Sequence, residues 1–244
     1  MSIQAKIDYI NRLFDECFSA DGALELNGKF IGDDGLQALL ESEKKLEDVE
    51  DLDLTRNNLT HRGFIPLAQS ARFTSLKRLY IGDNNIGDKG ATALAEAPFA
   101  ANLAQLDVRF NNIGAPGGLA LAKSPRFAKL QALILQENSI GDAAVAEIAK
   151  SPAFANLRKL NLYRTNITDA GIKILAKSKS LRKVKHLNLA RNVLRLDAAL
   201  YLAGTKTLTH IETLMMYDTF ITAAGAKAIV ESPSFANLKT LRMT

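Results

Sequence analysis

Aliphatic residues recur along this chain in a fixed pattern. An aliphatic residue is followed by two variable positions, a leucine, one variable position, another aliphatic residue, two variable positions and usually an asparagine. The pattern begins 27 residues apart each time, at Val49, Leu76, Leu103, Leu130, Leu157, Val184, Ile211 and Leu238. A fixed period of this length indicates a repeat architecture, in which each unit folds into one small supersecondary structure.

Each unit predicts one strand and one helix. Aliphatic and variable positions alternate in the first part, as in residues 79–81, which is typical of a short strand. The second part, for example residues 88–96 and 142–150, has apolar residues three to four positions apart, as a helix does. Asp88 and Asp142 stand where a helix start favours an acid. Ser151-Pro152 and related pairs end the helices, because proline cannot continue one.

The alternation predicts an α/β fold in which each unit is a right-handed crossover between parallel strands. Neighbouring strands lie about 4.8 Å apart, whereas packed helices need about 10 Å. The stack must therefore bend. We predict a horseshoe solenoid with a parallel sheet on the concave face and helices on the convex face.

The two ends of the array differ from its middle. A solenoid needs caps over its terminal repeats, and residues 3–18 place Ile3, Ile7, Ile10 and Phe14 on one helical face. We predict one continuous domain: residues 1–48 as a helical cap with a degenerate first repeat, 49–237 as seven repeats, and 238–244 as a terminal strand. We expect a monomer, and the alternative is a homodimer through the open strand edge.

One unit shows the motif in full, at residues 130–142, with the sequence Leu-Gln-Ala-Leu-Ile-Leu-Gln-Glu-Asn-Ser-Ile-Gly-Asp. This motif resembles the ribonuclease-inhibitor-like class of leucine-rich repeats, in the 27-residue form found in bacterial proteins, over about four-fifths of the chain. The resemblance implies the horseshoe fold. It leaves the partner open, because this fold serves many unrelated functions.

An asparagine column follows the strands. Its side chains can hydrogen-bond backbone groups in the tight turn that leaves each strand. We therefore predict a structural ladder of Asn57, Asn84, Asn111, Asn138 and Asn192.

Positions that vary between repeats are expected to point outward from the strands, onto the concave face. Tyrosine, methionine, arginine and phenylalanine are common in binding hot spots. We predict that a partner contacts Tyr80, Arg109, Phe110, Ile134, Tyr163, Arg164, Arg191, Met215 and Tyr217. The alternative is that these are scattered exposed side chains without a role.

A second feature is a basic stretch with no acid between Asp169 and Asp197. Residues 1–122 contain 12 basic and 18 acidic residues, and residues 123–244 contain 19 and 8. The stretch could contact an acidic protein, a phosphate-rich polymer or anionic lipid, or be a solvated outer face. No aromatic residues alternate with it, which argues against nucleic-acid binding. The predicted basic patch is Lys173, Lys177, Lys179, Arg182, Lys183, Lys185 and Arg195.

Catalytic chemistry is not indicated. The three histidines lie in different repeats without metal-ligand spacing, and no serine has the context of a nucleophile. We predict no catalytic residue, no metal and no cofactor. No stretch is long and apolar enough for a transmembrane helix, and charged residues interrupt the N-terminus where a signal peptide would be apolar. The single cysteine, Cys17, favours a reducing cytoplasm; the alternative is secretion into a host cell without a classical signal peptide.

These observations predict a non-catalytic protein-interaction module that binds a macromolecule, a protein of unknown identity, on its concave face. Three alternatives remain. One is a regulator of a partner enzyme, similar to the GTPase activators found among related solenoids. Another is a self-assembling structural protein. The last is a bacterial effector delivered into a host cell.

Overall fold

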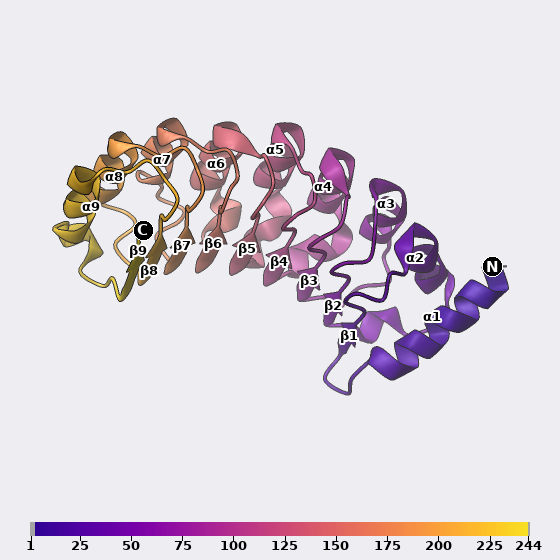
Figure 1. Cartoon of the computed structure of the whole chain (residues 1–244). Coiled ribbons are helices and arrows are strands. Elements are labelled where there is room, and N and C mark those ends of the chain that lie inside the picture. Colours follow the sequence, from indigo (N-terminus) through magenta and orange to yellow (C-terminus); the bar gives the residue numbers. More distant parts are fainter. Residues whose placement is uncertain (1–2, 244) are drawn as a thin grey trace.

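The computed structural model describes residues 3–243, in which nine short strands form one open sheet (Figure 1). The strands follow chain order, and every neighbouring pair is parallel. Leu52 pairs with Leu79, and the later pairs keep the same step, which confirms the 27-residue period. The strands are β1 (Ala23–Glu25), β2 (Asp51–Asp53), β3 (Arg78–Tyr80), β4 (Gln105–Asp107), β5 (Ala132–Ile134), β6 (Lys159–Asn161), β7 (His186–Asn188), β8 (Thr213–Met215) and β9 (Thr240–Arg242).

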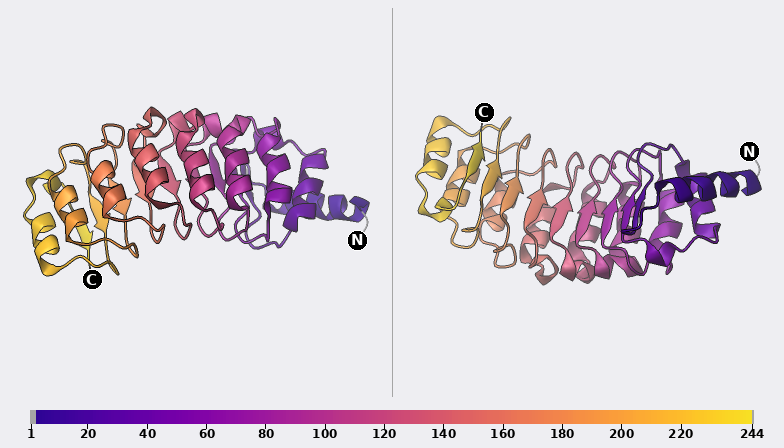
Figure 2. Two further views of the ribbon diagram at one scale, coloured as in Figure 1. Left: turned by 90° about the horizontal axis from the view of Figure 1, so that it is seen from above. Right: turned by 90° about the horizontal axis from the view of Figure 1, so that it is seen from below.

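Helices cover the outer side of the arc, and the strands line its inner side (Figures 1 and 2). The predicted α/β horseshoe solenoid is therefore confirmed. Short 3-10 helices such as Pro125–Lys129 and Pro152–Phe154 precede several strands. The helices are α1 (Ile3–Cys17), α2 (Gly32–Glu41), α3 (His61–Gln69), α4 (Gly87–Glu96), α5 (Ala115–Lys123), α6 (Gly141–Lys150), α7 (Asp169–Leu175), α8 (Leu196–Ala203) and α9 (Ala223–Val230).

The core lies between the sheet and the helices. The aliphatic residues of the repeat are buried in it from Leu24 to Leu214. A row of aromatic rings runs through the same layer, where Phe127 stacks on Phe154 at 6.1 Å. Phe99 lies one position before its column, yet its ring still packs edge-on against Phe73 at 6.4 Å.

Buried asparagines link each turn to the turn of the preceding repeat. The Asn138 Oδ1 accepts from the amides of Asn111 (3.1 Å) and Ile113 (2.9 Å). Its Nδ2 donates to the carbonyl oxygens of Val108 and Leu135. Asn57, Asn84, Asn111 and Asn192 make equivalent bonds. In one repeat Thr165 stands in this column, and its hydroxyl donates to the Leu162 carbonyl.

Aspartates at the helix starts cap the helix of the following repeat as well as joining the first turn of their own. The Asp142 carboxylate accepts from the backbone N–H (2.7 Å) and the hydroxyl (2.6 Å) of Thr168. Asp33, Asp88 and Asp169 accept from the next repeat in the same way. Each aspartate gives a hydrogen-bond acceptor to a backbone N–H group at the start of the next helix. The aspartate therefore stabilises the helix of the following repeat. The sequence pattern places the acids but does not show this cross-repeat contact.

The helix α1 covers the first repeat, with Ile10, Leu13 and Phe14 buried against it. β1 pairs with β2 so that Leu24 lies beside Leu52, a step of 28 residues. Met1, Ser2 and Thr244, which the predicted cap and terminal strand include, lie outside the described residues, as does the side chain of Ile3. None of the described helices is long and apolar enough to cross a membrane.

Candidate functional site

Three columns of side chains form the concave face. The first and third residues of each strand point outward, and so does the residue two positions after the strand. The middle column contains Tyr80, Asp107, Ile134, Asn161 and Met215; the last contains Arg109, Gln136, Tyr163, Ala190 and Tyr217. The column that begins the strands, from Asp51 and Arg78 to Lys159, His186 and Thr213, was missed in the sequence analysis, although the same period of two would have found it.

An aromatic cluster lies over β6, β7 and β8. The rings of Tyr163 and Tyr217 are 6.2 Å apart, with a tilt of 54°. They approach each other because the residue between them in the column is the small Ala190. The guanidinium of Arg191 lies 5.7 Å from the centre of the Tyr163 ring, and its Nε donates to Asp218 at 2.9 Å. The hydrogen bond to Asp218 raises the pKa of Arg191 and holds the guanidinium against the ring.

Met215 lies half-buried beside this cluster in the neighbouring column. We call Tyr163, Arg191, Met215 and Tyr217 the tyrosine cluster. Its members come from three consecutive repeats, and the rigid sheet fixes their spacing.

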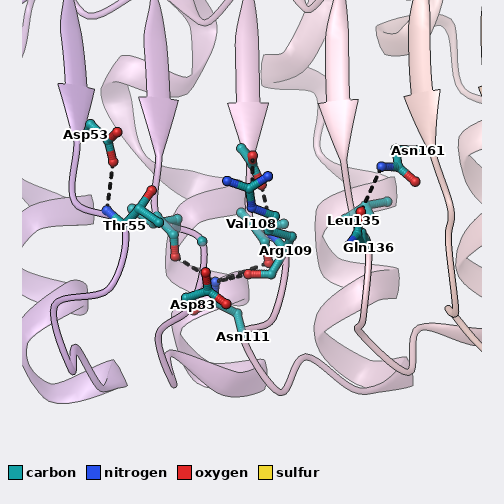
Figure 3. Close-up of polar contacts among 12 residues, drawn as sticks. Asp53, Thr55, Asp83, Val108, Arg109, Asn111, Leu135, Gln136 and Asn161 are labelled. Atoms are coloured by element: carbon teal, nitrogen blue, oxygen red, sulfur yellow. Dashed lines mark hydrogen bonds and ion pairs between the residues drawn. The ribbon is translucent and has the colours of Figure 1, made fainter. Parts of the chain in front are cut away.

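The other half of the concave face is polar and partly acidic (Figure 3). Asp51 and Arg78 form an ion pair, and the Asp53 carboxylate accepts from the Thr55 amide at 2.8 Å. Burial, followed by the nearby charge of Asp51, raises the pKa of Tyr80. The Arg109 side chain lies over Gly82, where a Cβ atom would come within 3.0 Å of it.

Asp107 is the most buried acid of this face, with 6 % of its surface exposed. Burial raises the pKa of its carboxyl group, and the hydrogen bond from the Arg109 amide at 3.1 Å opposes this. Asp107 therefore binds its proton more tightly in the folded chain than at the ordinary value of 3.8. Its contribution to stability is largest below that value and is lost as the pH rises through the raised pKa.

We expect Asp107→Asn to gain stability relative to the natural chain as the pH rises from about 3 to about 7. The amide keeps an acceptor for the Arg109 N–H and carries no buried charge. Urea denaturation of both proteins across this pH range measures the difference. A difference that stays constant or shrinks with rising pH would contradict the assignment.

One residue predicted for the contact surface is buried, and two others are exposed. Ile134 is 5 % exposed, because Asp107 and Asn161 flank it at the same register of the curved sheet, and it offers a partner little surface. We leave it out of the site. Phe110 is exposed, in a left-handed turn conformation with φ of 50°. Arg164 is also exposed and pairs with Glu137 at 2.9 Å.

Known proteins share this architecture. Residues 74–95, 100–122 and 155–176 match the family described as Leucine Rich repeat, and the strands of all these segments keep the 27-residue register. The chain is a leucine-rich-repeat protein. Whether its repeats are of the ribonuclease-inhibitor-like class stays a prediction.

Solved structures with the same fold include internalin C2 of Listeria monocytogenes, which is 18 % identical over 96 % of both chains, with a TM-score of 0.59. A second internalin of that organism is 17 % identical, over 86 % of this chain and 63 % of its own, with a TM-score of 0.48. No curated protein matches the sequence. At these identities the likeness to internalin C2 concerns the fold alone.

The predicted basic patch of this leucine-rich-repeat protein does not form one surface. Lys173, Lys177 and Lys179 lie together at α7 and the turn after it, on the convex side, and Lys173 lies 5.6 Å from the Tyr201 ring. Arg182, Lys183 and Lys185 lie on the segment that leads into β7, whereas Arg195 lies just before α8, beyond that strand. The stretch is divided because the chain winds once around the solenoid in each repeat.

The leucine-rich-repeat array offers few groups for catalysis. Among residues 3–243, no cluster of three or more histidine, cysteine, aspartate or glutamate side chains could hold a metal ion. His186 contacts Thr213 at 3.1 Å across neighbouring strands, and His61 and His210 lie in other repeats.

Proposed function

We propose that this protein is a non-catalytic module that holds a protein partner on its concave face, centred on the tyrosine cluster. The leucine-rich-repeat fold in general is a protein-interaction module, and solenoid curvature creates an extended concave binding surface. The observation that supports this particular site is the Tyr163–Tyr217 pair, held 6.2 Å apart across Ala190.

The physical chemistry of the cluster suits binding. Tyrosine and arginine are enriched in hot spots, because they bury large areas and still make hydrogen bonds. The two rings are positioned by neighbouring strands, and Arg191 is held by Asp218 and Tyr163. Little conformational entropy is then lost on binding.

Acidic and aromatic side chains lie at different ends of the concave face. The strand β2 presents Asp51 and Asp53, whereas β6 to β8 present the tyrosines and Arg191. A partner with a basic end and an apolar end would dock in one orientation, since charge complementarity sets register. We further propose a reducing, cytoplasmic location, because Cys17 is a free, half-buried thiol among the described residues.

The test is a comparison of two double variants. Tyr163→Ala with Tyr217→Ala removes both rings of the cluster, and Tyr9→Ala with Tyr201→Ala is the matched control on the outer surfaces. We expect a partner captured from native lysate to bind the cluster variant roughly 100-fold or more weakly than the natural chain, by titration, since two hot-spot residues each cost about 2 kcal/mol or more. The control should bind unchanged.

Circular dichroism melts must first show that both variants are folded. Equal affinity of the cluster variant and the natural chain would overturn this site. A loss that is the same in both variants would move the contact away from the concave face.

A further inference from the structure

A groove runs along the edge where the strands begin, away from the tyrosine cluster. It has a volume of about 730 Å³ and extends across the segments that lead into β2 to β7. We call it the amino-edge groove. It is lined by Glu50, Thr74, Ser75, Lys77, Asn102, Ala104, Lys129, Gln131, Asn156, Arg158 and Lys183.

Cations in the middle of this edge have no acidic partner. Residues 98–106, 125–134, 152–161 and 179–188, which form the edge at four successive repeats, contain no aspartate or glutamate. None of the ion pairs found within residues 3–243 involves Lys129, Arg158, Lys159, Arg182 or Lys183. The Lys129 and Lys183 ammonium groups instead donate to the side-chain amide oxygens of Asn102 (3.0 Å) and Asn156 (2.8 Å).

Acids return at the two ends of the edge. Glu50 pairs with Lys77 at 2.7 Å. Glu212 pairs with both Lys185 and Lys239, and these contacts lower its pKa to about 2. The uncompensated charge is therefore confined to the groove between them.

The opposite edge of the sheet, where the strands end, shows the contrast. Its cations have an acid in the neighbouring repeat: Arg56 with Asp83 at 3.2 Å, Arg164 with Glu137 at 2.9 Å, and Arg191 with Asp218 at 2.9 Å. The same repeat architecture can thus place an acid beside each cation. Along the amino-edge groove it does not, and the like charges repel one another in the free protein.

We propose that the amino-edge groove binds an extended, acidic segment of a protein. Neighbouring repeats are about 4.8 Å apart at the strands, so Lys129 and Lys183 are separated by about 10 Å. An extended chain in the polyproline II conformation advances about 3.1 Å per residue with three residues per turn, so acids three residues apart lie on one side of it and face these two lysines. Arg158 lies between them, and the Gln131 amide, which takes part in no side-chain hydrogen bond found within residues 3–243, can bond the backbone of the segment.

The lining favours a peptide over other polyanions. No aromatic side chain lines the groove, so bases of a single-stranded nucleic acid would have no ring to stack on. A groove also suits a narrow chain better than the flat surface of a bilayer. This inference concerns another surface and does not depend on the proposed tyrosine cluster.

The experiment uses the full chain and a fluorescein-labelled peptide with glutamate at every third position. Fluorescence anisotropy measures its affinity for the natural chain, for Lys129→Ala/Arg158→Ala/Lys183→Ala, and for the convex triple Lys150→Ala/Lys173→Ala/Lys177→Ala, which has the same net charge. We expect the groove triple to bind at least about tenfold more weakly, and the convex triple within about twofold of the natural chain. Binding should weaken with salt, and the same peptide with glutamine should not bind.

Several results would overturn the inference. No binding to the natural chain, or equal loss in both triples, would show that the groove does not select the peptide. Tighter binding of an oligouridine RNA or of phosphatidylserine vesicles, lost in the groove triple, would replace the peptide by that ligand. The Tyr163→Ala/Tyr217→Ala variant should keep its affinity for the peptide, so failure of one site is distinguishable from failure of the other.

Discussion

Asn138→Ala is expected to lower the free energy of unfolding by roughly 3–5 kcal/mol, since each buried polar group left without a partner costs about 1–3 kcal/mol. The Asn138 side chain accepts from two amides, those of Asn111 and Ile113, at 3.1 and 2.9 Å. It also donates to the Val108 and Leu135 carbonyl oxygens. Asn138 is 2 % exposed, so water cannot easily replace these bonds.

Urea denaturation followed by circular dichroism measures this effect. Asn85→Ala is the matched control, because Asn85 is exposed in the turn two repeats earlier and its side chain takes part in no hydrogen bond found within residues 3–243. A change within about 0.5 kcal/mol is expected there, as for most surface substitutions. If Asn138→Ala unfolds at the same urea concentration as the control, the asparagines do not hold the turns together.

The 27-residue period made most of the fold predictable from the sequence. Once the strands are aligned at that step, the period of two places Leu52 and Leu79 inward, and Tyr80 and Tyr163 outward. The fold could be inferred because its contacts join the same position in neighbouring repeats. The cap α1 followed from one apolar helical face, where Ile10 and Phe14 are buried.

Contacts between residues that occupy different positions in their repeats could not be predicted in the same way. The Asp142 carboxylate reaches Thr168, which is 26 residues further along the chain and in a different column. The residues of the predicted basic patch do not form one surface, because residues that are close along the chain lie on different sides of the solenoid. The amino-edge groove was missed for the converse reason: six successive repeats each contribute one to three residues, and these are far apart in the sequence.

The candidate site, too, could be predicted only in part from the sequence. Tyr163 and Tyr217 belong to one column two repeats apart, so their alignment was visible in the sequence, whereas their contact depends on the small Ala190 between them. Burial of Ile134 depends on the curvature of the sheet and on its neighbours Asp107 and Asn161. A pattern of inward and outward positions does not show how much of an outward side chain stays exposed.

Gly171→Ala is expected to lower the free energy of unfolding by about 1–3 kcal/mol, the usual cost of an added methyl group in a tightly packed position. A Cβ atom at this position would lie 2.4 Å from Oδ1 of Asp142. The same carboxylate holds Thr168, the N-cap residue of α7, by accepting from its amide at 2.7 Å. The alanine must therefore displace the carboxylate, and the Thr168 N–H at the helix start loses its acceptor.

The effect should reverse in the background of Asp142→Ala. Without the carboxylate, the nearest remaining atom of residue 142 is its Cα, at 3.5 Å, an ordinary contact distance. Alanine then fits, and its better helix propensity should stabilise the chain by up to about 1 kcal/mol relative to glycine. The coupling energy between the two substitutions is therefore expected to be roughly 2 kcal/mol or more.

A double-mutant cycle measured by urea denaturation tests this coupling. Asp197→Ala replaces Asp142→Ala in the control cycle, because Asp197 is exposed in the first turn of α8 and lies in the next repeat. Gly171→Ala should cost the same with and without Asp197. Additive costs in the Asp142 cycle would mean that the glycine is required for its backbone rather than for the space that the capping carboxylate occupies. Coupling in that cycle alone would show that the glycine and the aspartate of adjacent repeats act as one unit, which fixes how each helix is stacked on the one before it.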